Sequence, residues 1–185
     1  VANALIHRDF SVTGTHPMVE IFSDRMEILS PGALLPTVEI KRLVDVSPES
    51  RNELFASLMR RMHICEERGS GIDKALFAVE LFGLPPIKFI DGHKTFSAIV
   101  YSPKSFKQMS QEERLNACLQ HCCLRYYVAQ DPMTNTSLRK RLGLKDGQYA
   151  VAWKVIASAM AQKLIKPRGS GKQSRRYAAY VPFWA

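Results

Sequence analysis

The sequence lacks the features of a membrane protein and of a disulfide-bonded secreted protein. No apolar run approaches the roughly 20 residues that a membrane-spanning helix needs, and the first residues do not follow the pattern of a signal peptide. Cysteine is scarce, with four in 185 residues, which argues against a disulfide scaffold and for a reducing compartment. We therefore expect a cytoplasmic protein that has no membrane partner.

Familiar catalytic and metal-binding patterns are also missing from the sequence. It contains no Gly-Lys-Ser/Thr phosphate loop and no Ser/His/Asp or Cys/His set at a recognisable spacing. Cys118, His121 and Cys122 share a predicted helix, but their spacing is not that of a zinc site, and buried cysteines are ordinarily small apolar core residues. We expect no metal site, no catalytic residue and no helicase activity.

Acidic residues are scarce in the second half of the chain. Residues 105–185 hold 14 Lys and Arg against 4 Asp and Glu, a net charge of +10, whereas residues 1–104 hold 12 against 13 and carry a net charge of −1. A polar stretch that contains Pro103 separates the two halves. We predict two domains, over 1–104 and 105–185, and a basic partner surface on the second.

The first half mixes short strands and helices. Alternating apolar residues predict strands, and apolar residues three or four apart predict helices. In chain order the predicted elements are a helix over 1–8, strands over 18–22 and 26–29, helices over 50–62 and 72–82, and strands over 87–90 and 95–101. The first two strands form a hairpin, since only three residues separate them. This order predicts an α+β fold.

The second half shows three helical patterns followed by a basic loop and a strand. The predicted helices cover 112–130, 134–142 and 148–164, and the strand covers 176–183. Thr134 is a suitable N-cap for the second helix, and Gly143 follows its end. Three helices and a basic hairpin in this order are typical of a winged helix-turn-helix, so we expect duplex DNA as the partner.

The third of these helices is the expected DNA-facing element. Trp153, Ile156 and Met160 form a stripe that we expect to face the core, together with Ala157 and Leu164. The candidate groove-facing residues lie opposite or beside this stripe: Gln148, Val151, Lys154, Val155 and Ser158. Because none of them is an Arg placed for a guanine contact, we expect binding mainly through phosphates. The candidate phosphate-binding residues lie on the second helix and on the hairpin, or wing: Arg139, Lys140, Arg141, Lys166, Arg168, Lys172, Arg175 and Arg176.

Five segments of the sequence resemble a known family. They are residues 3–9, 19–32, 50–52, 66–72 and 176–185. In this order, and over nearly the whole chain, they resemble the C-terminal region of proteins named ATP-dependent DNA helicase RecG-related, which are bacterial transcriptional regulators that usually carry an upstream Schlafen-like AlbA domain. The resemblance implies a DNA-binding regulator. We expect the chain to be part of a longer protein, since it has no initiator Met.

The first half is similar, more remotely, to the GHKL ATPases, the class that includes DNA gyrase and histidine kinases. That resemblance implies a degenerate α/β sandwich in which ATP and Mg²⁺ are the candidate cofactors and Asn3 helps to hold the Mg²⁺. The loop that covers the ATP phosphates would consist of Gly69, Ser70 and Gly71. Ser30 stands where these ATPases have the Asp that binds adenine, and their general-base Glu would lie upstream of this chain. We therefore expect no ATP hydrolysis.

Other interpretations of these residues remain open. Asn3 suits the cap of a helix end, and Gly69 and Gly71 suit a tight turn. One alternative function is a nucleotide-binding switch that is active only with the upstream part. Another is a docking or dimerisation module, because winged helices also bind proteins, runs of basic residues are often only solvated, and the apolar tail over 178–184 suits packing on a partner or a second copy.

Overall fold

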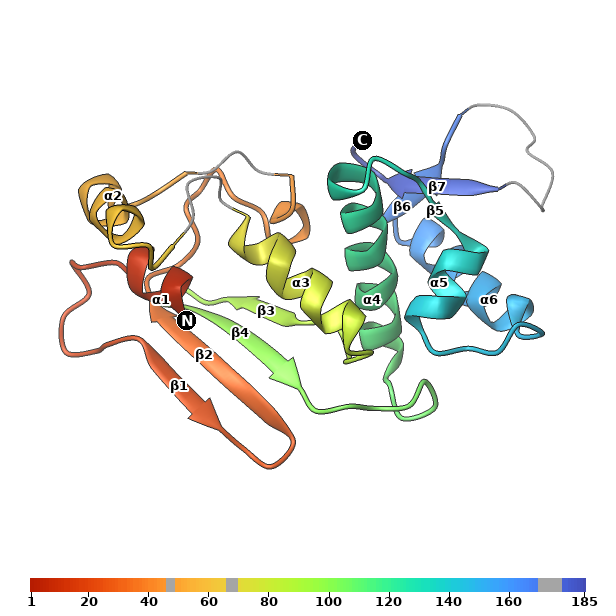
Figure 1. Cartoon of the computed structure of the whole chain (residues 1–185), viewed down its shortest axis with the longest axis horizontal. Coiled ribbons are helices and arrows are strands. Elements are labelled where there is room, and N and C mark those ends of the chain that lie inside the picture. Colours follow the sequence, from red (N-terminus) through yellow and green to blue (C-terminus); the bar gives the residue numbers. More distant parts are fainter. Residues whose placement is uncertain (46–48, 66–69, 170–177) are drawn as a thin grey trace. The chain divides into compact units, whose positions relative to one another are not determined.

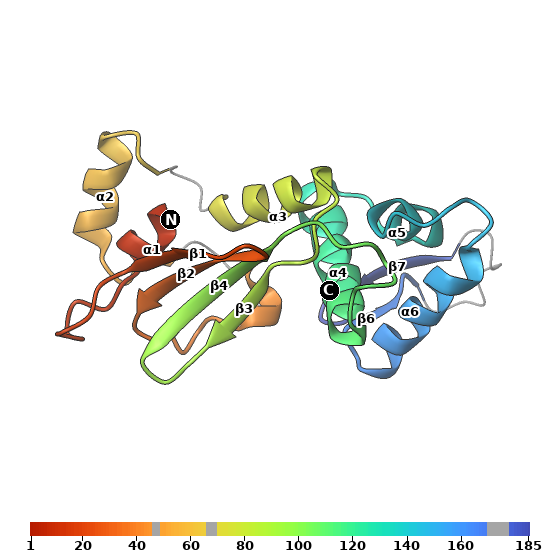
Figure 2. The same cartoon turned by 90° about the horizontal axis from the view of Figure 1, so that it is seen from below.

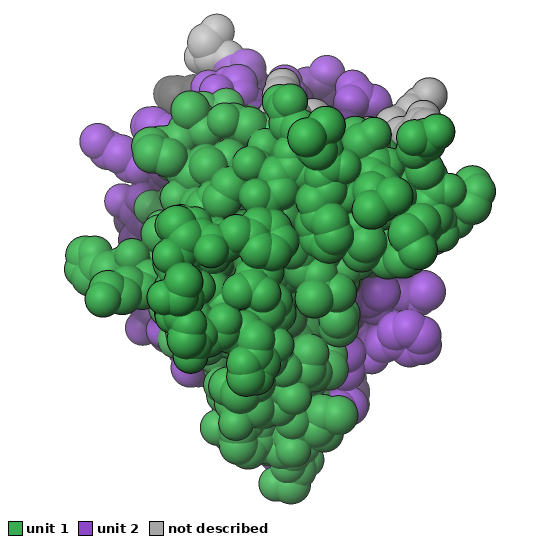
Figure 3. All heavy atoms as spheres, turned by 90° about the vertical axis from the view of Figure 1, so that its left-hand side faces the viewer, with its two compact units in different colours: residues 1–75, 87–102 green, residues 76–86, 103–185 purple. Residues whose placement is uncertain are grey.

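The computed structural model describes residues 1–45, 49–65, 70–169 and 178–185. They form two compact units, residues 1–75 with 87–102 (unit 1) and residues 76–86 with 103–185 (unit 2), which Figure 3 colours separately. The expected domains, 1–104 and 105–185, stay a prediction; the units differ from them chiefly in residues 76–86, which pack with unit 2. In the part of the chain described, no helix is both long and apolar enough to cross a membrane.

A four-stranded antiparallel sheet forms the centre of unit 1 (Figure 1). The strands run in the spatial order β1 (Met18–Ile21), β2 (Arg25–Pro31), β4 (Thr95–Tyr101) and β3 (Lys88–Asp91). The predicted hairpin is confirmed, since Ile21 pairs with Met26 and the Phe22 N–H donates to the Arg25 carbonyl at 2.8 Å. The second predicted pair of strands is confirmed as well.

The helices of unit 1 are short. They are α1 (Ala2–Ile6), the 3-10 turn η1 (Ile40–Arg42) and α2 (Glu53–Arg61), followed by the start of α3 (Gly71–Leu81). Ile6, Ala56 and Met59 form a buried cluster between α1 and α2. The helix predicted over 50–62 is therefore present. Its apolar residues Leu54 and Leu58, which are four positions apart, face outwards and are 90% and 51% exposed. Together these observations confirm a mixed α+β fold with antiparallel sheets.

The described part of unit 2 contains the second half of α3, the helices α4 to α6 and a small antiparallel sheet (Figure 2). Its elements after α3 are α4 (Gln111–Cys123) with a π-helical turn η2 (Leu124–Val128), β5 (Met133–Thr134), α5 (Asn135–Arg141), α6 (Tyr149–Ala161), β6 (Ile165–Pro167) and β7 (Ala179–Pro182). The strands lie in the order β5-β7-β6. All three predicted helices are present, whereas the two-residue strand β5 carries no sequence pattern.

Side-chain caps start α4 and α5. The Ser110 hydroxyl accepts from the Glu113 N–H at 3.1 Å, and the Glu113 carboxylate accepts from the Ser110 N–H at 2.7 Å. Thr134 and Ser137 make the same reciprocal pair, which confirms Thr134 as the N-cap. Such a box satisfies two backbone N–H groups that the helix leaves free. Gly143, with φ of 62°, follows the end of α5 as expected.

The core of unit 2 is built around α4. Leu115, Cys118 and Cys122 are buried there, with Cys118 against Met133 and Cys122 against the Tyr180 main chain. Burial raises the pKa of the Cys118 thiol to about 12, so the thiol stays neutral. Within the described ranges no three His, Cys, Asp or Glu side chains come together as metal ligands.

The predicted core face of α6 is confirmed in part: Ile156 and Leu164 are buried as expected, whereas Trp153 is not. The buried residues are Ala152, Val155, Ile156 and Ala159, while Trp153 is 48% exposed. Alanines on the inner face let α6 approach α4 and α5 closely, so the wide indole does not fit there and lies on the outside. The expectation that Val155 faces DNA is therefore corrected, since this side chain belongs to the core.

A buried ion cluster joins α3, α4 and α5 within unit 2. The Glu80 carboxylate accepts from His121 Nδ1 at 2.9 Å, and Arg141 Nε lies 3.4 Å from the other carboxylate oxygen. Arg141 is only 8% exposed; burial lowers its pKa, and the Glu80 charge opposes that shift. The expectation that Arg141 binds a DNA phosphate is wrong, because its guanidinium is covered and paired.

We predict that Glu80→Ala lowers the free energy of unfolding of unit 2 by about 3 kcal/mol, because it leaves Arg141 buried without its counter-ion. Urea unfolding followed by tryptophan fluorescence measures this, since both tryptophans lie in unit 2. Glu20→Ala, on the exposed strand β1, is the control and stays within about 0.5 kcal/mol of the wild type. A loss below about 1 kcal/mol for Glu80→Ala would show that the cluster is not a buried ion pair.

Candidate functional site

The first candidate site is the basic surface of unit 2. This unit holds 15 Lys and Arg against 5 Asp and Glu. Lys140 on α5, Lys154 on α6 and Arg168 after β6 are exposed, and Lys166 on β6 is half-buried. A polyanion is the kind of partner that such an excess of positive charge attracts.

Hydrogen bonds fix the turn between α5 and α6, which lie side by side (Figures 1 and 2). Arg139 donates to the main-chain oxygen of Asp146 and to Thr136 Oγ1. Asn135 Nδ2 donates to the Tyr149 carbonyl at 3.0 Å, and Gln148 Oε1 accepts from the Lys145 N–H at 2.8 Å. Two predicted DNA contacts, Arg139 and Gln148, therefore hold the start of α6 in place.

The outward face of α6 differs from the predicted one. Lys154 is exposed as expected, and Val151 and Ser158 are half-buried at the edges of that face. Sequence analysis missed Tyr149, which is 67% exposed, and Trp153. Sequence analysis normally assigns aromatic residues to the core. The signal that could have shown a different core face here is the pair of alanines, Ala152 and Ala159, that α6 buries.

Four predicted site residues lie outside the described residues. These are Gly69, Lys172, Arg175 and Arg176. Their roles stay predictions.

The second candidate site lies at the start of α3 in unit 1. A Cβ added to Gly71 would lie 3.3 Å from both Asn3 Oδ1 and Asn3 Nδ2, so the Asn3 amide rests against the Gly71 backbone. Ser70 precedes the helix, and its carbonyl accepts from the Lys74 N–H at 3.0 Å. The structure thus brings together Asn3 and the described end of the predicted phosphate loop.

Ser30, the residue that the ATPase resemblance places at the position of the adenine-binding Asp, is buried. Ser30 is 6% exposed, and its hydroxyl donates to the Ala4 carbonyl of α1 at 2.9 Å. A hydroxyl that is bonded within the core is not available to a base. Ser30 therefore attaches α1 to the sheet.

Arg51 and Asn52 connect the N-terminal segment to α2. Arg51 Nη1 lies 3.1 Å from Asp9 Oδ2, and Arg51 Nη2 donates to the Ala33 carbonyl at 2.7 Å. Asn52 Nδ2 donates to the carbonyls of Ile6 and Arg8, both at 2.8 Å. Hydrogen bonds from Ser11, with the charge of Arg51, hold the pKa of Asp9 below its ordinary value.

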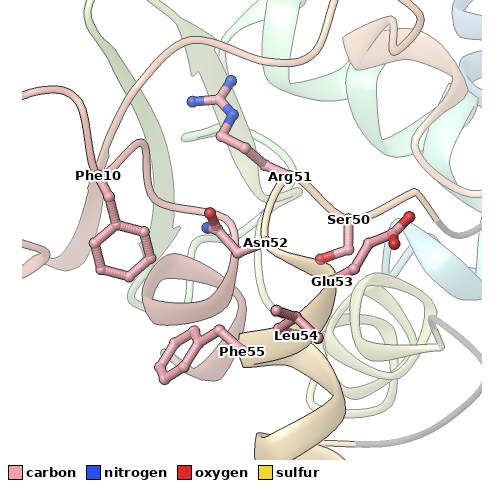
Figure 4. Close-up of a pocket in the computed structure, with 7 residues that line it drawn as sticks. All are labelled: Phe10, Ser50, Arg51, Asn52, Glu53, Leu54 and Phe55. Atoms are coloured by element: carbon pink, nitrogen blue, oxygen red, sulfur yellow. The ribbon is translucent and has the colours of Figure 1, made fainter.

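A pocket of about 560 Å³ lies beside these residues (Figure 4). It is lined by Phe10, Ser50, Arg51, Asn52, Glu53, Leu54 and Phe55. The Phe10 and Phe55 rings meet edge to face, with centroids 5.9 Å apart. Arg51 and Asn52 already bond to main-chain oxygens, and Ser50 and Glu53 add a hydroxyl and a carboxylate to the lining. None of the predicted site residues lines this pocket.

Unit 1 thus combines an antiparallel sheet with helices in a way that is consistent with an ATPase-like α+β domain. Residues 14–100 match the family described as "Putative ATP-dependent DNA helicase recG C-terminal", which confirms the RecG-related resemblance for this part of the chain. No curated protein shows significant similarity to the chain.

A solved structure similar to this chain is that of the DIP2311 protein from Corynebacterium diphtheriae. The match has a TM-score of 0.51 and 12% identity, and it covers 97% of this chain. It covers 48% of that protein, so this chain spans about half its length. At this identity the likeness shows the fold alone.

The packing of Arg51 predicts the cost of a side chain at Gly32. A Cβ there would lie 2.2 Å from Arg51 Nη1 and 2.5 Å from Asp9 Cβ, and Gly32 has φ of +100°. We expect Gly32→Ala to lower the free energy of unfolding by about 3 kcal/mol or more, through backbone strain and overpacking together. Urea unfolding followed by circular dichroism measures this.

Gly14→Ala is the matched control. Gly14 also has a positive φ, of +75°, but an added Cβ meets nothing within 4 Å. This variant carries the backbone strain alone and loses only about 1 kcal/mol. Equal losses for the two variants would show that Arg51 does not pack against Gly32.

Proposed function

We propose that this chain is the DNA-binding part of a transcriptional regulator and that unit 2 binds duplex DNA as a winged helix. The observation that carries the proposal is the element order α4-β5-α5-α6-β6-β7 with the sheet order β5-β7-β6. In a winged helix the third helix follows a short turn and the last two strands form the wing. Here α6 takes the place of the third helix.

Charge supports the same proposal. Lys140 and Lys154 are exposed on α5 and α6, and Arg168 is exposed where the chain leaves β6. Cations arranged in this way neutralise phosphates and release counter-ions, which gives affinity without sequence readout. The ATPase-like unit 1 then has a regulatory rather than a hydrolytic role, since Ser30 replaces the adenine-binding carboxylate.

The DNA proposal predicts that affinity depends on salt and that Lys140 and Lys154 both contribute to this dependence. Lys140→Ala with Lys154→Ala weakens binding to a labelled duplex and reduces the slope of log K against log salt by about 0.9 for each lost phosphate contact. Fluorescence anisotropy at several salt concentrations measures both. Lys94→Ala, at an exposed lysine of unit 1, leaves the slope unchanged. A slope that the double variant does not change would remove α5 and α6 from the interface.

A second candidate function is nucleotide binding by unit 1, which the contact of Asn3 with Gly71 favours. Glycine backbone N–H groups at the start of a helix approach phosphate oxygens, and an Asn side-chain oxygen is a Mg²⁺ ligand. The chain would then bind ATP and Mg²⁺ without hydrolysing ATP.

Calorimetry of the chain with ATP and Mg²⁺ tests this candidate. We expect micromolar binding that Asn3→Ala weakens by about tenfold or more, because a polar contact to a charged ligand is lost. Asn135→Ala, in unit 2, is the control and keeps the affinity. Heats equal to those of dilution, with the wild-type chain folded, would exclude a nucleotide site in this chain.

A further inference from the structure

Two aromatic side chains stand on the outside of α6. Tyr149 is 67% exposed and Trp153 is 48% exposed. They are four residues apart in a helix, so their Cβ atoms lie about 6 Å apart on one face. A Trp is usually well buried, and two exposed aromatic rings on one helical face require an explanation beyond folding.

Positive charge surrounds this aromatic pair. Lys154 adjoins Trp153 in the sequence and is exposed, and Lys145 is exposed in the turn before α6. The acidic residue of that turn, Asp146, has its carboxylate 3.4 Å from Arg139, so its negative charge is balanced. The neighbourhood of the rings therefore suits an anionic ligand that also has flat apolar groups.

The outward side of α6 is better suited to stacking on the flat surfaces of bases than to hydrogen bonding with base edges in a groove. Reading base edges in a duplex groove takes Arg, Asn or Gln side chains along the helix. Gln148 is exposed beside Tyr149, but its side-chain oxygen accepts from the Lys145 N–H, and Ser158 is half-buried at the edge of this side. Apart from Lys154, the other exposed or half-buried residues beside the rings are alanines: Ala150, Ala157 and Ala161. Aromatic rings instead stack on bases, and the bases of a duplex already stack on one another.

We propose that the aromatic pair Tyr149 and Trp153 binds unpaired bases of single-stranded DNA by stacking, while Lys145 and Lys154 bind the adjoining phosphates. This inference rests on the proposed DNA-binding function and adds, to the duplex contacts of unit 2, a site on α6 for unpaired bases. The chain then prefers sites at which a duplex is opened. A protein partner is a weaker fit, because unit 2 is strongly basic around these rings.

Anisotropy with two labelled probes tests the proposal on the whole chain. The probes are a 20-nucleotide oligo(dT) strand and a blunt 20-base-pair duplex. We expect Trp153→Ala to weaken binding to the single strand about tenfold and to change duplex binding less than about twofold. Trp153→Phe keeps a ring and recovers most of the affinity. Phe82→Ala, at a 74% exposed ring elsewhere in unit 2, is the control and changes neither affinity.

Fluorescence gives a direct measure of stacking. In a Trp184→Phe chain, Trp153 is the remaining tryptophan. We expect oligo(dT) to quench its emission and the duplex to leave the emission nearly unchanged. Quenching that the two probes share equally would overturn the preference for unpaired bases.

The outcomes separate this inference from the function on which it rests. A wild-type chain that is folded but binds neither probe would overturn the DNA-binding function itself. Binding to both probes that Trp153→Ala leaves unchanged would overturn only the stacking site. Sedimentation that shows a dimer, which Trp153→Ala dissociates, would assign the aromatic pair to a second copy of the chain and would also overturn the inference.

Discussion

The ion pairs that the half-buried Glu80 carboxylate makes with buried side chains are the interactions on which the arrangement of unit 2 depends. This carboxylate pairs with His121 of α4 and with Arg141 of α5, and it reaches them from α3. A buried guanidinium is costly unless a counter-ion accompanies it, so α5 is stable in this position only while α3 is packed there. Because Arg141 is the last residue of α5, the cluster also sets where the turn to α6 begins.

Several features of the fold could be predicted because their causes are local in the sequence. The hairpin of β1 and β2, the Thr134 cap and the Gly143 helix end each depend on residues within a few positions of one another. The buried position of Arg141 could not be predicted, since its partner Glu80 lies in a different helix 61 positions earlier. A run of three basic residues resembles a solvated phosphate-binding helix until that partner is known.

The buried side of α6 was in part predicted incorrectly for a different reason. Hydrophobic periodicity gives most weight to the largest apolar residue, and Trp153 dominates any such pattern. The helix instead buries small residues, and Ala152 and Ala159 are fully covered. Close packing of helices favours small side chains where two backbones approach, whatever their hydropathy. Because the alanines face the core, the indole of Trp153 lies on the outside of the helix.

Polar side chains in unit 1 hold the segments of its ATPase-like fold together. The Ser30 hydroxyl bonds to α1, and the Arg51 guanidinium packs against Gly32 and Asp9. Both groups therefore join segments of unit 1 to one another. By contrast, the Asn3 amide rests against Gly71, and neither of these residues belongs to the Arg51 and Asp9 ion pair. The proposed binding of phosphates and Mg²⁺ at Asn3 and Gly71 would therefore not depend on the residues around Ser30 and Arg51.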